Sequence, residues 1–308
     1  MATAYFTHPV CIKHDPGPGH PESPARLIAV NEALAEFDGL LRAEAPEATI
    51  AQLERVHGSA YINSVLAAVP DEGYRSLDPD TALSPASGEA ALRAAGGVCA
   101  AVDLVAKGKA GNAFCAMRPP GHHAEASQAM GFCLFNNVAI GALHAQAVHG
   151  LKRVAVVDFD VHHGNGTQHS FENDASLFYA SSHQWPAYPG SGAATETGVG
   201  NIVNVPLSPR PGSSDFRAAY RHAILPRLRD FAPDFLLISA GFDAHERDPL
   251  AQLNVTTEDF AWLSRALAEL AAGVCGGRLV STLEGGYDLP ALAASAAAHV
   301  TALMEASP

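Results

Sequence analysis

Short apolar runs rich in β-branched and aromatic residues alternate along the chain with longer, alanine-rich stretches of helical period. This alternation is typical of an α/β protein whose sheet is mainly parallel. The predicted strands are residues 4–8, 113–117, 154–159, 177–180, 202–205, 235–239 and 279–283, and the predicted helices are residues 87–106, 136–148, 214–229, 257–272 and 290–304. Composition does not change across the Pro- and Gly-rich loops, so we expect one domain over residues 1–308.

Clusters of polar residues stand at the predicted carboxyl ends of five strands. They are RPPGHH after residues 113–117, DFDVHHGNG at the end of 154–159, SSH after 177–180, AGFDAH after 235–239 and EGGY after 279–283. Ligands of parallel α/β sheets bind beyond the carboxyl ends of the strands. We therefore expect the five clusters to converge on one pocket, although they are far apart in the sequence.

The DFDVHHGNG cluster carries the residue types of a metal site. Asp158, Asp160 and His162 alternate with apolar residues, which would place all three on one side of an extended chain. Asp160 and His162 offer one carboxylate and one imidazole, and Asp243 of SAGFDAH is the best remote candidate for a third ligand. A D-x-H pair alone is more often a solvated strand end, but the second strand end favours a ligand set. Two carboxylates and one imidazole leave a position open on Zn²⁺, which indicates a catalytic site.

Two further clusters offer groups for acid–base and oxyanion chemistry. His122 and His123 are adjacent imidazoles that titrate near neutral pH, although loop histidines are often simply exposed. Tyr287 follows two glycines that allow the backbone to approach a ligand, and its phenol could donate to a developing oxyanion. The glycine-rich nucleotide-binding motifs, G-x-S-x-G and H-E-x-x-H do not occur, so nucleotide-binding and serine-hydrolase interpretations lose their main support.

The charge balance narrows the range of partners. The formal net charge is -13, from 19 Lys and Arg against 32 Asp and Glu, which disfavours binding to nucleic acid or to an anionic membrane. The five cysteines form no C-x-x-C pair, so we expect reduced thiols and no disulfide framework. The N-terminus does not resemble a signal peptide, and the apolar stretch 289–304 falls short of a membrane span, so we expect a cytoplasmic protein.

Six motifs together resemble the signature of the histone deacetylase family, which includes acetylpolyamine amidohydrolases and acetoin-utilisation proteins. They are RPPGHH, GFCLFNN, DFDVHHGNG, SAGFDAH, DPL and LEGGY. The resemblance runs in order from His20 to Leu289. It implies an arginase-like α/β fold with an eight-stranded, mainly parallel sheet flanked by helices. It also implies an acetylated amine as substrate, with acetate and a free amine as products.

The resemblance further implies a role for each matching residue. Zinc would be held by Asp160, His162 and Asp243. His123 would act as general base and acid, with His122 as its electrostatic partner and Asp158 behind His122. Tyr287 would polarise the acetyl carbonyl. Phe132, Tyr188 and Leu250 match the walls of an acyl-lysine tunnel, the Gly131 carbonyl matches the acceptor of the substrate amide, and Arg26 matches a residue at an inner cavity for acetate. A structural potassium ion would use Asp158, backbone oxygens near Asp160 and His162, and the Ser181 hydroxyl.

The sequence departs from the first class of histone deacetylases at one of these positions. Asn165 stands where that class has Asp, so His123 would lean on a neutral amide, as in the second class. HHGNG, GFDAH and LEGGY also resemble the second class. Tyr287 is retained, which predicts activity on unactivated acetyl amides. His163 has no role in this scheme, and we expect it to support the site from outside the ligand set.

Three functions follow from these residues. The leading hypothesis is a zinc deacetylase acting on acetyl-lysine, an acetylpolyamine or another small amide. A non-catalytic protein that binds acetyl-lysine would not need the whole set of polar residues. A binuclear manganese hydrolase like the arginases would need extra ligands, which Asp158 and His163 could offer. The sequence leaves open the substrate, the acyl-chain length and whether the chain forms a homo-oligomer.

Overall fold

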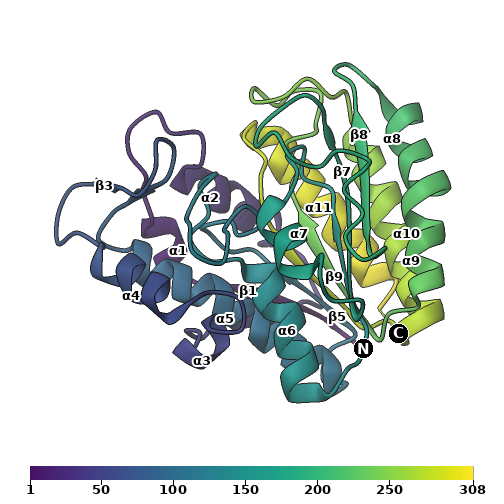
Figure 1. The fold of residues 1–308 in the computed structure, drawn as a ribbon, viewed down its shortest axis with the longest axis horizontal. Coiled ribbons are helices and arrows are strands. Elements are labelled where there is room, and N and C mark those ends of the chain that lie inside the picture. Colours follow the sequence, from purple (N-terminus) through teal and green to yellow (C-terminus); the bar gives the residue numbers. More distant parts are fainter. Residues whose placement is uncertain (308) are drawn as a thin grey trace.

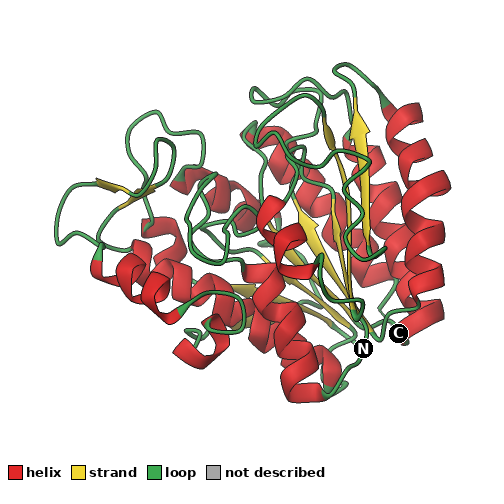
Figure 2. Cartoon of the chain, in the orientation of Figure 1, coloured by secondary structure: helices red, strands yellow, loops and turns green. Residues whose placement is uncertain are grey.

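An eight-stranded sheet forms the centre of the structure, in the strand order β2-β1-β5-β10-β9-β6-β7-β8 (Figures 1 and 2). Every neighbouring pair of these strands runs parallel. The computed structural model describes residues 1–307. The strands are β1 (Thr3–Thr7), β2 (Leu41–Glu44), β5 (Asn112–Cys115), β6 (Val154–Asp158), β7 (Leu177–Gln184), β8 (Ile202–Leu207), β9 (Phe235–Ala240) and β10 (Leu279–Leu283). The predicted parallel α/β architecture is confirmed.

Helices cover both faces of the sheet (Figure 2). One layer contains α5 (Ser87–Ala106) and α6 (Asn137–His149), which pack against each other. The other layer is built from α2 (Pro24–Ala33), α11 (Leu289–Glu305), α10 (Thr257–Cys275), α8 (Ser213–Ala219), the π-helical segment η1 (Tyr220–Ile224) and α9 (Leu225–Phe231). Shorter elements at the periphery and near the site are α1 (Val10–Lys13), α3 (Ile50–Leu53), α4 (Ser59–Ala67), α7 (Asn165–Phe171) and the hairpin of β3 (Arg75–Ser76) and β4 (Ala82–Leu83).

The residue composition of these elements fits their positions. Every residue of β6, β9 and β10 is buried, which explains why β6 (VAVVD) and β9 (FLLISA) begin as runs of four apolar residues instead of alternating. Strand β10 (LVSTL) also buries Ser281 and Thr282. Helix α5 is rich in Ala and Gly because it packs closely: a side chain at Gly96 would come within 2.1 Å of the Pro46 carbonyl oxygen. Helix α6 begins at the side-chain cap of Asn136 and ends at Gly150, which has a φ of 65°.

Several predicted boundaries were wrong, and each has a physical reason. Strand β2 was missed because its residues, LRAE, are mostly exposed and lack a strand pattern; it exists because it pairs with β1. Strand β7 continues to Gln184, so the SSH cluster belongs to the strand and does not follow it. Strand β6 ends at Asp158, and the chain bends over residues 160–162. Asp160 and His162 therefore do not project from a straight extended strand.

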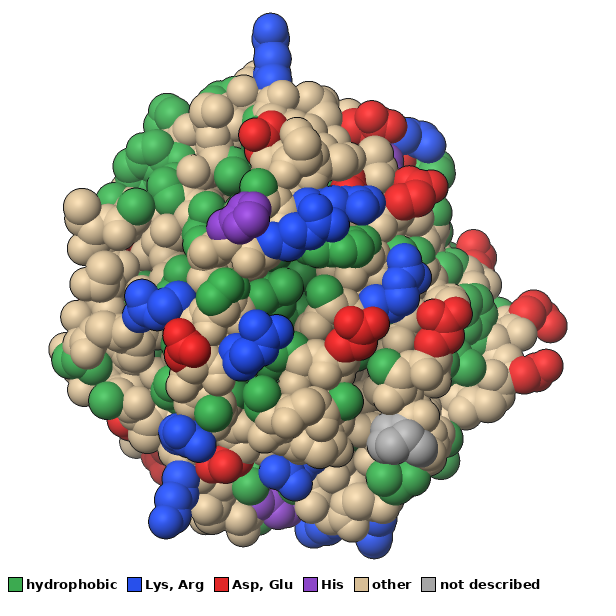
Figure 3. Space-filling view, turned by 90° about the vertical axis from the view of Figure 1, so that its right-hand side faces the viewer, with side chains coloured by type: hydrophobic (Ala, Val, Ile, Leu, Met, Phe, Trp, Pro, Cys, Tyr) green, Lys and Arg blue, Asp and Glu red, His purple; other side chains and the backbone are tan. Residues whose placement is uncertain are grey.

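The outer surface carries charges of both signs. On the face shown in Figure 3, acidic and basic side chains are interspersed with apolar ones, with no large area of a single sign. All five cysteines are buried and free, which matches the expectation of unpaired thiols. None of the helices in residues 1–307 has the length and apolar character needed to cross a membrane.

Candidate active site

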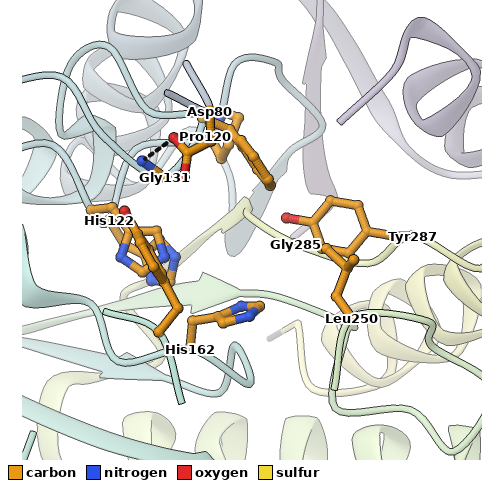
Figure 4. Close-up of a pocket in the computed structure, with 11 residues that line it drawn as sticks. Asp80, Pro120, His122, Gly131, His162, Leu250, Gly285 and Tyr287 are labelled. Carbon is orange, nitrogen blue, oxygen red and sulfur yellow. Dashed lines mark hydrogen bonds between the residues drawn. The ribbon is translucent and has the colours of Figure 1, made fainter. Parts of the chain in front are cut away.

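A cavity of about 190 Å³ opens at the carboxyl end of the sheet (Figure 4). It is lined by Asp80, Pro120, His122, His123, Gly131, Phe132, His162, Tyr188, Leu250, Gly285 and Tyr287. These residues come from the loops that follow β5, β6, β7, β9 and β10 and from the segment before β4. Three of the five polar clusters, RPPGHH, DFDVHHGNG and EGGY, thus line one pocket, because parallel strands present their carboxyl ends at the same edge. The SSH and AGFDAH clusters supply no residue of this lining.

The predicted ligand set lies together, and His162 brings it to the wall of this cavity. Ligand atoms of Asp160, His162 and Asp243 lie within 4.8 Å of one another. The Nδ1 atom of His162 is 3.1 Å from Asp160 Oδ1 and 3.1 Å from Asp243 Oδ2. Both carboxylates are buried, whereas the His162 ring lines the cavity. Two carboxylates and one imidazole this close together fit a divalent metal ion such as zinc.

The backbone holds both carboxylates in place. Asp160 accepts hydrogen bonds from the backbone N–H of Gly285, at 2.8 Å, and of His162, at 2.9 Å, while Asp243 accepts one from Val161 N–H at 2.8 Å. Gly285 leaves room for them, since a Cβ atom there would come within 2.2 Å of Asp243 Oδ2 and 2.6 Å of Asp160 Oδ2. The same loop that carries Tyr287 therefore shapes the ligand cradle.

The protonation of the ligand set shows how much negative charge is concentrated there. Burial, together with the nearby Asp160 carboxylate, raises the pKa of Asp243 to about 7. Burial opposes a charge on His162, but hydrogen bonds from its ring to the two carboxylates outweigh this and raise its pKa to about 10. Without a metal ion, a proton on His162 partly neutralises the two carboxylates. A bound cation would take over that role.

His122 and His123 lie beside this ligand set with different partners. Their ring centroids are 3.9 Å apart. His122 Nδ1 is 3.0 Å from Asp158 Oδ2, and His123 Nδ1 is 2.8 Å from Asn165 Oδ1. Each ring therefore has one nitrogen fixed by a neighbour of the DFDVHHGNG segment, which leaves the Nε2 side for other contacts.

Burial and the neighbouring charges set the two imidazoles in opposite states. Burial disfavours a charged His122, but the carboxylates of Asp158 and Asp160 outweigh this and raise its pKa to about 10. Burial lowers the pKa of His123 well below its usual value, and the positive charges of His122 and His162 lower it further. At neutral pH the pair thus contains one charged ring, His122, and one neutral ring, His123.

Tyr287 faces the two histidines across the cavity, with its hydroxyl directed into the pocket (Figure 4). Its backbone N–H donates to Asp248 Oδ2 at 2.7 Å, and its ring lies 6.0 Å, centroid to centroid, from Phe132. The guanidinium of Arg26 lies 4.8 Å from the ring centre. Burial raises the pKa of Tyr287 well above its ordinary value, so the hydroxyl keeps its proton and can donate it in a hydrogen bond.

The remaining predicted pocket residues divide into mouth and interior. Tyr188 and Leu250, which are 39% and 40% exposed, stand at the mouth, and Phe132 lies opposite Tyr287. Gly131 lines the cavity, and its N–H donates to Asp80 Oδ1 at 3.1 Å (Figure 4). Arg26 is fully buried behind Tyr287 and does not line the cavity itself.

Asp158, Ser181 and His163 do not line the cavity. Asp158 and Ser181 are paired across β6 and β7, and the Ser181 hydroxyl contacts His183 Nδ1 at 2.9 Å. His163 points away from the ligand set: its Nδ1 is 2.8 Å from Ser191 Oγ, and its Nε2 is 2.8 Å from Gln168 Oε1. These contacts join His163 to the loop that carries Ser191 and to helix α7.

Comparisons with known proteins identify the family of the chain. A family model described as "Histone deacetylase domain" matches residues 20–303. The chain belongs to the histone deacetylase family. It is 39% identical over 308 residues to histone deacetylase 14, chloroplastic, of Arabidopsis thaliana, in a match that covers 92% of this chain and 73% of that protein. It is 37% identical over 310 residues to a histone deacetylase-like amidohydrolase of Pseudomonas aeruginosa, covering 92% of this chain and 81% of that one.

A solved structure confirms the fold of this histone deacetylase family member. The crystal structure of the HDA15 HD domain matches with a TM-score of 0.94 at 39% sequence identity, and the match covers 99% of this chain and 88% of that chain. The fold expected from the resemblance, that of the arginases and deacetylases, is thereby confirmed. Family membership also supports a deacetylase or amidohydrolase, and it implies a metal-dependent one.

The structure adds residues to the site that the sequence reasoning did not single out. Glu284, inside the LEGGY motif, is fully buried, and its carboxylate accepts the N–H groups of Gly121 at 2.7 Å and His122 at 3.2 Å. Burial raises its pKa to about 7. Asp80 lines the pocket although no motif points to it. Glu284 was detectable as the charged residue beside two glycines at a strand end, whereas Asp80 required the tertiary structure.

A second group of possible ligands lies between α5 and α6. Asp103 Oδ1 is 2.9 Å from His144 Nε2 and 2.7 Å from His149 Nε2, so this group also has metal-ligand types close together. The Lys107 ammonium, 3.2 Å from Asp103 Oδ2, already neutralises this carboxylate. The group is therefore explained as a hydrogen-bonded contact between two helices.

Proposed function

We propose that the chain is a zinc-dependent amidohydrolase that removes acetyl groups from acetylated amines such as acetyl-lysine and releases acetate and the free amine. The observation that carries the proposal is the convergence of three ligand residues, a pair of histidines in opposite charge states and a tyrosine hydroxyl on one cavity. A protein that only binds acetyl groups has no need of all these groups in one place.

Asp160, His162 and Asp243 would hold the metal ion. Bound there, zinc supplies Lewis-acid polarisation of an amide carbonyl and activation of water near neutral pH. The proposal names zinc because two carboxylates and one imidazole with an open position are typical of catalytic zinc sites. The other residues of the pocket can be assigned from their own geometry.

His123 is suited to move the proton. Its Nδ1 faces the Asn165 oxygen, so the ring proton belongs on Nδ1 and the lone pair of Nε2 is available on the other side. Because its pKa is depressed, the ring is neutral and can accept a proton from the attacking water. The resulting imidazolium can then deliver that proton to the departing amine nitrogen. His122 remains charged and stabilises the negative charge that develops nearby.

Tyr287 would complete the catalytic set by donating a hydrogen bond to the carbonyl oxygen as it becomes an oxyanion. Phe132, Tyr188 and Leu250 would enclose the aliphatic part of the substrate, and the Gly131 carbonyl would accept its amide N–H. Arg26, fully buried behind Tyr287, would face the leaving acetate from the interior. Asp158 and Ser181, paired across β6 and β7, would hold a potassium ion together with backbone oxygens.

Substrate, compartment and partners are also part of the proposal. Acetyl-lysine peptides and acetylpolyamines both carry positive charge near the amide, which suits a chain of net charge -13. We propose a cytoplasmic protein that contacts neither nucleic acid nor membrane. A small-molecule amide remains the alternative substrate, because the mouth formed by Tyr188 and Leu250 does not by itself distinguish a peptide from a polyamine.

The experiment that tests the function is an assay of zinc-loaded protein against acetyl-lysine peptides, acetylated polyamines and longer acyl-lysines. We expect release of acetate from at least one acetylated amine, and loss of that activity in Asp160→Ala. Activity that survives in Asp160→Ala would remove the metal from the mechanism. Binding of acetyl-lysine without turnover would favour the non-catalytic alternative, and two manganese ions per chain would favour an arginase-like centre.

A further inference from the structure

Glu125 lies two residues after His123 on the same loop and contacts the site from outside. Its Oε1 accepts a hydrogen bond from Asn165 Nδ2 at 2.5 Å. The other end of the same amide, Asn165 Oδ1, is the atom that faces His123 Nδ1 at 2.8 Å. A continuous chain of hydrogen bonds therefore runs from Glu125 through Asn165 to His123.

The polarity of this chain is fixed at its outer end. A carboxylate can only accept hydrogen bonds, so it binds the NH₂ end of the Asn165 amide and leaves the oxygen for His123. The backbone carbonyl of His123, 3.2 Å from Asn165 Nδ2, favours the same orientation. An amide oxygen also only accepts, so His123 must carry its proton on Nδ1. The lone pair of Nε2 is then the one left free.

Glu125 is itself held firmly and stays charged. Its backbone N–H donates to Gln128 O at 2.9 Å, and its carbonyl contacts His57 Nδ1 at 2.9 Å. His169 Nδ1 lies 2.8 Å from Glu125 Oε1 and 3.0 Å from Oε2. Burial alone would raise the pKa of Glu125, but the hydrogen bonds from His169 and Asn165 outweigh it and lower the pKa below its usual value.

The loop and the helix that carry this chain are pressed together. A Cβ atom at Gly166, the second residue of α7, would come within 2.1 Å of the Ala124 carbonyl oxygen. Only glycine allows the backbone beside Glu125 to approach the backbone beside Asn165 this closely. Backbone packing therefore keeps the two segments that carry the carboxylate and the amide close together.

We infer that Glu125 is a positioning residue: it fixes the orientation of the Asn165 amide, and through that amide the tautomer of His123. The Asn165 amide could present either its oxygen or its NH₂ group to His123, and the Glu125 carboxylate selects the oxygen. The catalytic consequence rests on the proposed function, because it concerns the base of that reaction. The tautomer itself can be measured whether or not the protein turns over a substrate.

The test exchanges the carboxylate of Glu125 and the amide of Asn165, first one at a time and then together. Glu125→Gln keeps the size of the side chain, but its amide can rotate and let Asn165 turn its NH₂ toward His123. Asn165→Asp places two carboxylates in contact. In the double variant, the carboxylate introduced at position 165 can accept from His123 Nδ1 while the amide introduced at position 125 donates to that carboxylate, which restores a consistent polarity. Glu172→Gln, at the C-terminal cap of the same helix, is the matched control for removing a charge.

We expect Glu125→Gln to lower kcat about tenfold with KM little changed, as for other residues that orient a catalytic group through one contact. Asn165→Asp should also lose activity, the double variant should recover to within about threefold of the unmodified protein, and Glu172→Gln should stay near it. Nitrogen-15 spectra of the histidine rings, with His123 assigned by a His123→Asn variant, should show the Nδ1–H form lost in part in Glu125→Gln and regained in the double variant.

An unchanged His123 tautomer in Glu125→Gln would overturn the inference, whatever the activity. So would a double variant with no more Nδ1–H form than Glu125→Gln, provided that thermal melts show all variants folded. If the unmodified protein hydrolyses no acetylated amine, the proposed function fails, while the ring spectra still decide the role of Glu125.

Discussion

Removing the Tyr287 hydroxyl should slow the proposed reaction strongly while leaving the fold intact. Tyr287→Phe keeps the ring, which packs 6.0 Å from Phe132 and 4.8 Å from the Arg26 guanidinium, so the packing behind the pocket is preserved. The change removes only the hydroxyl, a proton donor directed into the cavity (Figure 4). Loss of one oxyanion donor lowers kcat by about 10²- to 10³-fold, which corresponds to about 2.7–4 kcal/mol of transition-state stabilisation.

The assay is initial-rate kinetics of zinc-loaded protein on the best substrate found, with kcat and KM measured separately. We expect the loss to appear in kcat, since the donor acts on a charge that exists only in the transition state. Tyr188→Phe makes the same chemical change at the pocket mouth and should alter kcat by less than about threefold. Equal kcat values for Tyr287→Phe and the unmodified protein would refute the oxyanion role and with it the proposed chemistry.

Three further predictions concern the metal, its cradle and the core. Asp160→Asn should remove most of the tightly bound zinc measured by elemental analysis, whereas Asp103→Asn, in the other Asp and His group, should leave it unchanged; the reverse result would place the metal between α5 and α6. Gly285→Ala should weaken zinc binding at least about tenfold, because the added Cβ would lie 2.2 Å from Asp243 Oδ2. Gly273→Ala in α10 should leave zinc binding unchanged, because nothing lies within 4 Å of its added Cβ. Equal zinc affinities in the two variants would contradict the role of Gly285 in shaping the ligand set. Burial lowers the pKa of His299 to about 3, so the unfolded chain takes up a proton that the folded chain does not, and stability should fall as pH drops from about 6.5 toward 3. The free energy of unfolding, measured with urea between pH 6 and 4, should change with pH less steeply in His299→Gln, by about 1.4 kcal/mol per pH unit. Equal pH dependence in the two proteins would show that the His299 ring is protonated in the folded state.

The hydrogen bonds from Glu125 through Asn165 to His123 connect a residue outside the pocket to the proposed base. Asn165 in place of Asp leaves the pocket with one negative charge fewer beside the base, and Glu125 supplies a carboxylate next to that amide instead. The charge is then separated from His123 by a neutral group, so the ring is oriented without being held as an imidazolium. This arrangement fits a depressed pKa at His123 beside a raised one at His122.

The sequence determined the fold class and most of the ligand-bearing residues. Fully buried strands such as β6 and β9 are continuous apolar runs, which local pattern reveals, and the polar residues at their ends are necessarily at one edge of a parallel sheet. Asp160, His162 and Asp243 could therefore be grouped although about eighty residues separate the last from the others. The family resemblance added the roles of the individual side chains.

Only the tertiary structure decided the features that depend on contacts between distant segments. Strand β2 has no strand pattern and forms because β1 offers it an edge. The bend after Asp158, not a straight strand, turns Asp160 and His162 toward Asp243. The opposite charge states of the two adjacent histidines arise because the carboxylates of Asp158 and Asp160 outweigh the burial of His122, whereas burial and the charge of His122 lower the pKa of His123. Local pattern fixes which residues are buried and where strands end, whereas the electric field at each side chain depends on partners that only folding brings within a few ångströms.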